Sequence, residues 1–277
     1  MERFEGRVAA ITGAGSGIGR ALAEELGRRG AHLALSDIDE EGLATTAARC
    51  AGSPTAVTTR LVDVADREAV YAWADQVVDE HGTVNLIVNN AGVAVASTVE
   101  AMSYEDLDWL MGINLWGVVY GTKAFLPHLK AAGVGHVVNM SSVFGLLGIP
   151  SQSAYNAAKF GVRGFTDALR TELDIEDCGV SATTVHPGGI KTNISRNARV
   201  DASLAALGGD PGGGRDDFDR HLRTTPEKAA RQILDAVAKG RRRALIGPDA
   251  KLIDLLSRMP AGVHQRLVVA GARHRRR

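Results

Sequence analysis

The chain of 277 residues is poor in the features that mark several classes of protein. It has two cysteines, Cys50 and Cys178, which lie on separate predicted helices without the spacing of metal ligands. They predict neither a disulfide framework nor a metal site, and they favour a reducing compartment. No apolar run reaches the length of about 18 residues that a membrane span needs, and Met1–Gly6 lack the apolar centre of a signal peptide. We therefore expect a soluble, cytoplasmic protein.

An excess of charge of one sign is also missing. Lys and Arg together number 32, Asp and Glu together number 32, and the formal net charge is zero. This balance gives no reason to expect nucleic acid or another strongly charged partner. Hydrophobic residues make up 45% of the chain, and its 32 glycines suit tight turns between strands and helices. A chain of this length favours a single domain of about 200 to 250 residues that carries an extension, rather than two domains.

Short apolar runs with the length of buried strands alternate with helical stretches. Prominent helices are expected over Tyr104–Lys130 and Ser153–Glu176. This alternation predicts an α/β protein with a doubly wound, seven-stranded parallel sheet and helices on both faces. The expected strands are Val8–Thr12, His32–Ser36, Ala56–Leu61, Val84–Asn89, Gly135–Met140, Val180–His186 and Ala244–Ile246.

A glycine-rich turn follows the first expected strand. Residues 13–19 read Gly-Ala-Gly-Ser-Gly-Ile-Gly, and a helical stretch from Arg20 to about Arg29 comes next. A strand, a glycine turn and a helix in this order allow backbone N–H groups and the helix dipole to meet a pyrophosphate. The spacing is not G-x-G-x-x-G, because Ile18 takes the place of the third glycine and the pattern reads T-G-x-x-x-G-I-G. The alternative is a tight turn that binds nothing.

The second expected strand leads into Asp37. An acidic residue about twenty positions beyond such glycines can hydrogen-bond the adenosine ribose hydroxyls and repel a 2′-phosphate. Its neighbours Ser36 and Ile38 are uncharged, as is Ser16 in the glycine turn, so the sequence favours NAD over NADP. The alternative is that Asp37 caps the next helix, a role that Asp39 would fill equally well.

A serine, a tyrosine and a lysine form the candidate reactive group. Tyr155 and Lys159 are four residues apart, so on a helix they share one face. A phenol ordinarily has a pKa of ~10, and we expect the Lys159 ammonium to favour the phenolate. Ser142, thirteen residues before the tyrosine, is placed to hydrogen-bond a reacting oxygen, with Ser141 as the alternative. The set suits proton transfer to or from a hydroxyl or carbonyl. A tyrosine and a lysine on an exposed helix face are the other interpretation.

Together these motifs resemble the classical branch of the short-chain dehydrogenase/reductase family. The resemblance extends from Gly6 to about Pro248, with seven motifs in the family's order. It implies a single-domain Rossmann fold that binds a nicotinamide dinucleotide. The residues that carry it are Thr12, Gly13, Gly17, Ile18, Gly19, Asp63, Asn89, Asn90, Ala91, Gly92, Asn114, Ser142, Tyr155, Lys159, Pro187, Gly188 and Thr192.

The resemblance also implies roles for these residues. Tyr155 would exchange the proton, Lys159 would lower its pKa and hold the nicotinamide ribose, and Ser142 would orient the substrate oxygen. Asn114, in a predicted helix interior, would anchor a water that leads to Lys159, unless it only kinks the helix. The cofactor-binding residues implied are Gly13, Ser16, Gly17, Ile18, Gly19, Asp37, Asp63, Val64, Asn90, Ala91, Gly92, Tyr155, Lys159, Pro187, Gly188, Ile190 and Thr192.

The residues next to these motifs indicate the kind of substrate. They are mostly apolar, and some belong to the core in any case, but their number favours a small apolar secondary alcohol or ketone over a sugar phosphate. Arg196 and Arg199 are the nearest candidates for holding an anionic group. The apolar neighbours are Val93, Val95, Val143, Phe144, Leu146, Leu147 and Ile149.

Two regions depart from the regular pattern. Residues 193–225 contain Gly-Gly-Asp-Pro-Gly-Gly-Gly and stand where the family has its substrate-covering lid, so we interpret them as a lid with a glycine hinge at Gly208, Gly209 and Gly212–Gly214. A solvent loop is the alternative. Residues 249–277 form an extension beyond a domain at 1–248, with an amphipathic helix and a basic end. Such a helix more often packs on its own domain or on a sister subunit than on a membrane.

The sequence thus predicts an NAD-dependent oxidoreductase that acts on apolar alcohols or ketones. Two alternatives remain open: an NADP-linked carbonyl reductase, and a dinucleotide-binding regulator that has lost turnover. The family resemblance implies a homotetramer or homodimer.

Overall fold

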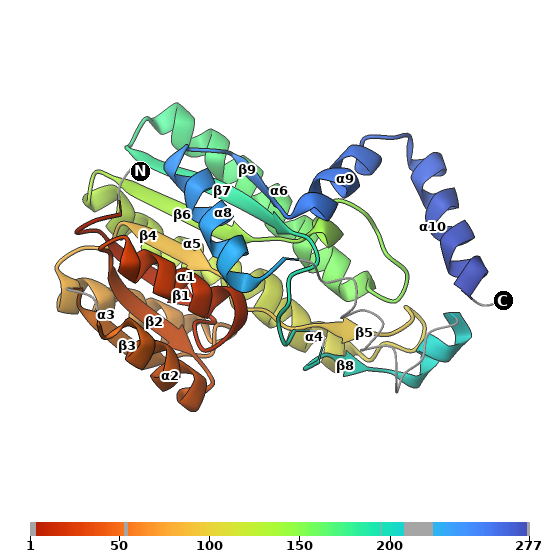
Figure 1. Cartoon of the computed structure of the whole chain (residues 1–277), viewed down its shortest axis with the longest axis horizontal. Helices are drawn as coiled ribbons and strands as arrows, with labels where there is room; N and C mark the ends of the chain where they lie inside the picture. Colours follow the sequence, from red (N-terminus) through yellow and green to blue (C-terminus); the bar gives the residue numbers. More distant parts are fainter. Residues whose placement is uncertain (1–3, 53–54, 195, 208–223, 276–277) are drawn as a thin grey trace.

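Seven parallel strands form the centre of the protein (Figure 1). The computed structural model describes residues 4–52, 55–194, 196–207 and 224–275. The strand order is β3-β2-β1-β4-β6-β7-β9, and every neighbouring pair is parallel. This confirms the predicted fold class. The strands are β1 (Val8–Thr12), β2 (His32–Asp37), β3 (Val57–Leu61), β4 (Leu86–Asn89), β6 (Gly135–Met140), β7 (Val180–Pro187) and β9 (Arg243–Ile246).

Helices connect the strands and cover the sheet. A second, two-stranded sheet pairs β5 (Val95–Ala96) with β8 (Arg199–Val200) beside α4 (Tyr104–Met111). The helices are α1 (Gly17–Arg28), α2 (Glu40–Cys50), α3 (Arg67–His81), α4 (Tyr104–Met111), α5 (Gly117–Ala131), α6 (Ser153–Glu176), α8 (Pro226–Ala238), α9 (Pro248–Ser257) and α10 (Ala261–Arg275). Shorter helical segments are η1 (Gly112–Trp116), η2 (Val143–Gly145) and η3 (Ala202–Leu207).

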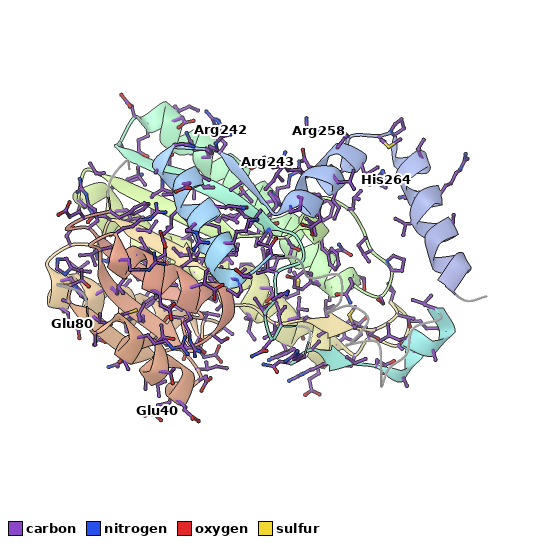
Figure 2. The ribbon with its side chains drawn as sticks, in the orientation of Figure 1. Glu40, Glu80, Arg242, Arg243, Arg258 and His264 are labelled. Atoms are coloured by element: carbon purple, nitrogen blue, oxygen red, sulfur yellow. The ribbon has the colours of Figure 1, made fainter. Side chains whose placement is uncertain are left out.

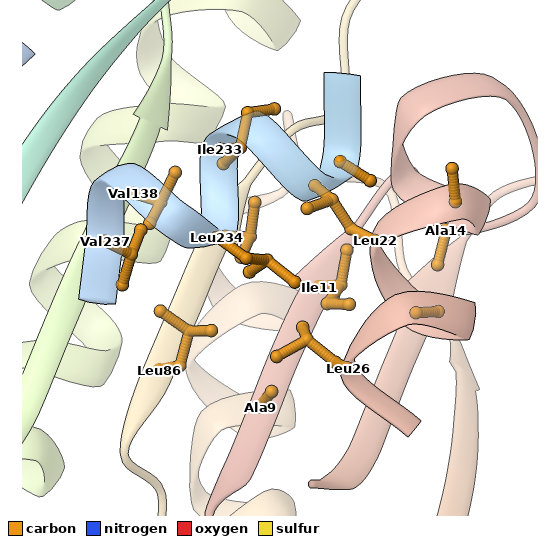
Figure 3. Packing of buried hydrophobic residues seen from close by; sticks show 14 of the residues in the cluster. Ala9, Ile11, Ala14, Leu22, Leu26, Leu86, Val138, Ile233, Leu234 and Val237 are labelled. Carbon is orange, nitrogen blue, oxygen red and sulfur yellow. The ribbon is translucent and has the colours of Figure 1, made fainter. Parts of the chain in front are cut away.

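Apolar side chains from the helices seal both faces of the sheet. On one face, Leu22 and Leu26 of α1 pack beside Ile233 and Leu234 of α8 (Figure 3). On the other face, α3 and α5 meet through Trp73 and Phe125, whose rings lie edge to face at 5.0 Å. Fully burying a side chain of this size contributes about 1.5–3 kcal/mol. Because both faces are covered, the central strands need continuous apolar runs, which is why their sequence signal is strong.

The order of the strands determines where a ligand site can form. From β1 the chain builds the sheet first in one direction through β2 and β3, and then returns to place β4 on the other side of β1. The carboxyl ends of β1 and β4 therefore border the point at which the direction reverses. In open parallel sheets this point forms a crevice that binds ligands.

Two local predictions need correction. The expected helix Tyr104–Lys130 is interrupted by a π-helical turn at η1, where backbone hydrogen bonds skip one more residue than in an α-helix. Cys178 lies after the end of α6 and not on a helix, because Asp177 ends α6 in a left-handed conformation with φ 51°.

The extension predicted at 249–277 contains two helices, α9 and α10. Leu252 and Leu255 of α9 are 59% and 64% exposed. The basic end falls outside the residues whose side chains the structure describes, as does most of the predicted lid with its glycine hinge. No helix in the described part of the chain is long and apolar enough to cross a membrane.

Candidate functional site

The glycine turn joins β1 to α1 at the crevice. Gly13 and Gly17 have φ values of 64° and 54°, the left-handed region that favours glycine. At Gly19 the requirement is one of space, because a Cβ there would overlap the carbonyl oxygen of Gly13 and the side chain of Asn90. Ser16 is the exposed N-cap of α1, and its hydroxyl makes no capping bond. The turn thus presents backbone at the helix N-terminus, as a pyrophosphate site requires.

A set of hydrogen bonds ties this turn to the end of β4. The Thr12 hydroxyl accepts hydrogen bonds from the backbone N–H groups of Asn90 and Ala91, at 2.9 and 3.0 Å. The Asn90 amide in turn donates to the carbonyl oxygens of Thr12 and Gly13, at 2.9 and 3.1 Å. These bonds bring together two motifs that are far apart in the sequence.

Two aspartates at the end of β2 have different partners. One oxygen of Asp37 accepts the N–H of Gly15 at 2.7 Å, and the other accepts the N–H of Asp39 at 3.0 Å. Asp39 is the residue that caps α2, since its carboxylate accepts the N–H of Gly42 at 3.0 Å. The role of helix cap, considered for Asp37 as an alternative, therefore belongs to Asp39. Asp37 instead turns its carboxylate toward the glycine turn.

Other predicted cofactor residues line the same edge of the sheet. Asp63 is exposed just after β3, and Val64 is buried close to Gly117. On the far side of the crevice, the segment after β7 brings the methyl group of Thr192 near Gly17: a Cβ on that glycine would lie 3.2 Å from it. The structure thus brings the ends of β1, β2, β3, β4 and β7 to one border.

The reactive group lies next to this border. The hydroxyl of Ser142 hydrogen-bonds the phenol of Tyr155 and also accepts the N–H of Phe144 at 3.1 Å. Ser141 is buried and donates its hydroxyl to the carbonyl oxygen of Lys159 at 2.8 Å. Of the two candidate serines, only Ser142 is therefore paired with Tyr155.

Lys159 and Asn114 approach the tyrosine side from two helices. The Lys159 ammonium donates to the carbonyl oxygen of Met140 at 2.9 Å and lies 5.5 Å from the centre of the Tyr155 ring. Asn114, in the π-helical turn, makes two 2.8 Å hydrogen bonds to the backbone of Val93. A Cβ on Gly92 would lie 3.3 Å from the Asn114 oxygen and 3.8 Å from the Lys159 nitrogen. The two side chains therefore converge around Gly92.

Burial controls the protonation of both groups. It raises the pKa of Tyr155 to about 12, against the opposing effect of the hydrogen bond from Ser142. It also lowers the pKa of Lys159 to about 8. The expected decrease of the Tyr155 pKa by Lys159 is therefore not found here. The physical reason is that the ammonium donates to Met140 and stands over the ring, and desolvation outweighs its attraction for a phenolate.

The buried lysine gives a stability prediction. Because its folded pKa of about 8 lies below the usual 10.5, the unfolded chain binds more protons between these values, and the stability of the wild type rises with pH there. Below pH 8 the full cost of the buried charge, roughly 3 kcal/mol, is present. We expect Lys159→Met to raise the free energy of unfolding at pH 7 by about 1–3 kcal/mol, since the lost bond to Met140 offsets part of the gain.

Urea unfolding at pH 7 and pH 9.5 measures this effect. The gain should shrink at the higher pH, where the wild-type lysine is largely neutral in the folded state. Lys123→Met on the exposed side of α5 is the matched control and should change stability by less than about 0.5 kcal/mol at either pH. An equal gain at both pH values would contradict a buried charge at Lys159.

Two residues that the sequence analysis did not identify hold the reactive group in place. Nδ1 of buried His186 lies 2.9 Å from the carbonyl oxygen of Ser142, which can only accept, so this nitrogen carries the hydrogen. Burial lowers the pKa of His186 to about 4 and keeps the ring neutral. Asn156 makes three hydrogen bonds, of 2.6 to 3.0 Å, to the backbone of Phe144, Leu147 and Ile149. In the sequence, only two local features point to these residues: His186 directly precedes Pro187-Gly188, and Asn156 directly follows Tyr155.

Apolar side chains pack against Tyr155. The Phe144 ring meets the Tyr155 ring edge to face at 5.9 Å. Arg199, considered for an anionic group, is already engaged: it pairs with Asp106 at 2.7 Å and lies 3.7 Å from the centre of the Trp109 ring. The apolar residues predicted here that are buried are Val95, Val143, Leu146 and Leu147.

Comparison with known proteins agrees with this geometry. Residues 7–203 match the family model described as short chain dehydrogenase. A protein of Mycobacterium tuberculosis (strain ATCC 25618 / H37Rv) named putative oxidoreductase SadH is 51% identical over 272 residues, which cover 98% of this chain and 97% of that protein. Human estradiol 17-beta-dehydrogenase 11 is 37% identical over 193 residues, which cover 69% of this chain and 64% of that protein.

A solved structure is similar over almost the whole chain. It is a short chain dehydrogenase/reductase from Burkholderia phymatum in complex with NAD, with a TM-score of 0.85 and 32% sequence identity. The match covers 92% of this chain and 94% of that one. The predicted Rossmann architecture is thus found in a relative that binds a dinucleotide.

Proposed function

The chain belongs to the classical short-chain dehydrogenase/reductase family and is an oxidoreductase, and from this premise we propose that it transfers a hydride between NAD(H) and an apolar secondary alcohol or ketone. One observation carries the proposal. The Tyr155 phenol, hydrogen-bonded to Ser142 and one helical turn from Lys159, stands beside the edge where the glycine turn and Asn90 meet.

The residues at this edge fit a nicotinamide dinucleotide. The glycine turn packs so closely on the end of β4 that a Cβ at Gly13 or Gly19 would overlap neighbouring protein atoms, and this packing sets the path of the backbone at the N-terminus of α1. Asp37 supplies carboxylate oxygens for the adenosine ribose, and Thr192 approaches the turn from the opposite side. We assign Asp63 and Val64 to the adenine side, and Pro187, Gly188 and Ile190 to the nicotinamide side. When bound, the dinucleotide supplies or accepts the hydride.

The proton chemistry falls to the chain itself. With a pKa of about 12, the Tyr155 phenol is protonated at neutral pH and is ready to donate to the oxygen of a ketone that is being reduced. In the oxidative direction it must accept the alcohol proton, which requires stabilisation of the phenolate. Lys159, whose ammonium lies 5.5 Å from the centre of the Tyr155 ring, supplies a cation for this task, and Ser142 holds the substrate oxygen in line. Asn114 secures Val93 and so shapes the space in front of Lys159.

An apolar substrate is supported by two observations. The Phe144 ring packs against Tyr155, Tyr155 also packs on the apolar cluster that contains Val95, and Arg199 is engaged by Asp106 and Trp109. One relative is named for dehydrogenation of estradiol, an apolar secondary alcohol. Desolvation favours such a substrate, because an apolar wall offers no partners to a charged group.

The reaction itself is tested by NADH formation from NAD with a panel of apolar secondary alcohols, and by NADH consumption with the matching ketones. Turnover with at least one apolar pair and none with sugar phosphates is the expected result. Tight NAD binding without turnover across the panel would instead support the non-catalytic regulator.

The preference for NAD over NADP is tested at Asp37. We expect Asp37→Ala to lower the ratio of kcat/KM for NAD to that for NADP by about tenfold or more, since a 2′-phosphate would no longer meet a carboxylate. Asp39→Ala is the matched control: it removes the cap of α2, costs about 1 kcal/mol of stability, and should leave the ratio unchanged. An unchanged ratio in Asp37→Ala would show that this carboxylate does not select the cofactor.

A further inference from the structure

A carboxylate from the C-terminal extension reaches back to the turn after β7. One oxygen of Asp249, in the first turn of α9, accepts the N–H of Gly189 at 2.5 Å. A Cβ on Gly188 would overlap this carboxylate, and a Cβ on Gly247 would lie 2.6 Å from its other oxygen. The carboxylate therefore occupies space that two glycines, distant from each other in the sequence, leave open.

The second oxygen of Asp249 is buried and has no hydrogen-bond donor among the described residues. Such an oxygen is costly, because it has lost its hydration without receiving a hydrogen bond in return. Attachment of α9 to the sheet does not explain this cost. That attachment has its own carboxylate, Asp254, which pairs with Arg243 at 2.9 Å and Arg258 at 2.8 Å beside α9 (Figure 2).

The turn that Asp249 holds leads directly to the dinucleotide edge. Gly189 also accepts the N–H of Thr224 at 3.3 Å, and Thr224 accepts the N–H of Lys191 at 3.0 Å. The next residue, Thr192, is the one whose methyl group lies near Gly17 of the glycine turn. A displacement of Gly189 would therefore move Thr192 relative to the N-terminus of α1.

We propose that Asp249 is a positioning residue for the dinucleotide: through Gly189 it fixes the turn from Pro187 to Ile190, and so the distance between Thr192 and the glycine turn. This inference rests on the proposed function and deepens it, because it assigns part of the cofactor site to the extension after β9. Asp249 acts through the backbone of the turn and needs no contact with the dinucleotide.

The test compares Asp249→Ala and Asp249→Asn with Asp254→Asn, a carboxylate of the same helix whose partners are Arg243 and Arg258. The dissociation constant for NADH is measured by fluorescence, together with KM and kcat. We expect Asp249→Ala to raise the NADH dissociation constant and the KM for NAD(H) about tenfold, as for a lost hydrogen bond to a charged group. Asp249→Asn should have a smaller effect, because its amide oxygen can still accept from Gly189. Asp254→Asn should lower the melting temperature and leave the NADH dissociation constant within about twofold.

A readout without nucleotide keeps the inference separate from the proposed function. Hydrogen exchange at residues 187–192 should be faster in Asp249→Ala than in the wild type, and unchanged in Asp254→Asn. If wild type fails to bind NADH, the proposed function falls and this role falls with it. If wild type binds NADH but Asp249→Ala binds it equally well, only the positioning role is overturned. Equal exchange in the wild type and Asp249→Ala would also overturn it.

Discussion

Replacing Tyr155 with Phe is expected to lower kcat by about 10²- to 10⁴-fold, the range lost with a general acid or base. The ring of Tyr155 packs edge to face against Phe144, and Phe retains this contact. The change removes only the phenol oxygen, whose partner is the hydroxyl of Ser142. Binding of the dinucleotide should therefore survive, with a dissociation constant for NADH within about twofold of the wild-type value.

Steady-state turnover and NADH fluorescence measure the two quantities separately. Tyr104→Phe, the same chemical change at a tyrosine that is 83% exposed, is the matched control and should retain full activity. If Tyr155→Phe kept more than about a tenth of the wild-type kcat, the phenol would not be the proton donor. Simultaneous loss of NADH binding and of the melting transition would mean instead that the variant had not folded.

Replacing Gly19 with Ala is expected to weaken NADH binding by roughly 10- to 100-fold. The new Cβ would overlap the Gly13 carbonyl oxygen and the Asn90 side chain, so the turn must shift away from its present path. Forcing one methyl group into a packed site costs about 1–3 kcal/mol. If this cost destabilises the conformation of the turn that binds NADH, it corresponds to the expected loss of affinity of roughly 10- to 100-fold. Unlike the Tyr155 variant, this one should lose affinity for the dinucleotide before it loses chemistry.

Gly164→Ala is the matched control for this substitution. Gly164 lies in α6, and a Cβ at this position would have no described atom of another part of the chain within 4 Å. Alanine here should therefore be neutral or stabilise the helix by up to about 1 kcal/mol. Titration with NADH and thermal melting distinguish the two variants. Unchanged NADH affinity in Gly19→Ala would exclude the glycine turn as the dinucleotide cradle.

Both variants probe parts of the site that could be predicted from the sequence. The glycine turn and the Tyr155–Lys159 spacing are local patterns: each depends on a few residues whose geometry is set by one strand end or one helix turn. The strands were visible for a similar reason. A parallel strand that is covered on both faces must be apolar along its length, and β1 and β6 were predicted with the bounds that they have in the structure.

The π-helical turn at η1 was not visible in the same way. The composition of Gly112–Trp116 does not separate this segment from an ordinary α-helix. Asn114 lies in this turn, and both polar atoms of its side chain hydrogen-bond the backbone of Val93, which belongs to an earlier segment of the chain. Spacing within one helix carries no information about such a partner.

The alternation of strands and helices, the glycine turn and the order of the Ser142, Tyr155 and Lys159 motifs could all be predicted without a structure, because each follows from residues that are neighbours in the chain. Tertiary structure decided which of two serines meets the tyrosine, which of two aspartates caps α2, and the direction in which the Tyr155 pKa moves. It also brought His186 to Ser142 and Asp249 to Gly189. These depend on burial and on contacts between distant segments, which exist only once the sheet has assembled.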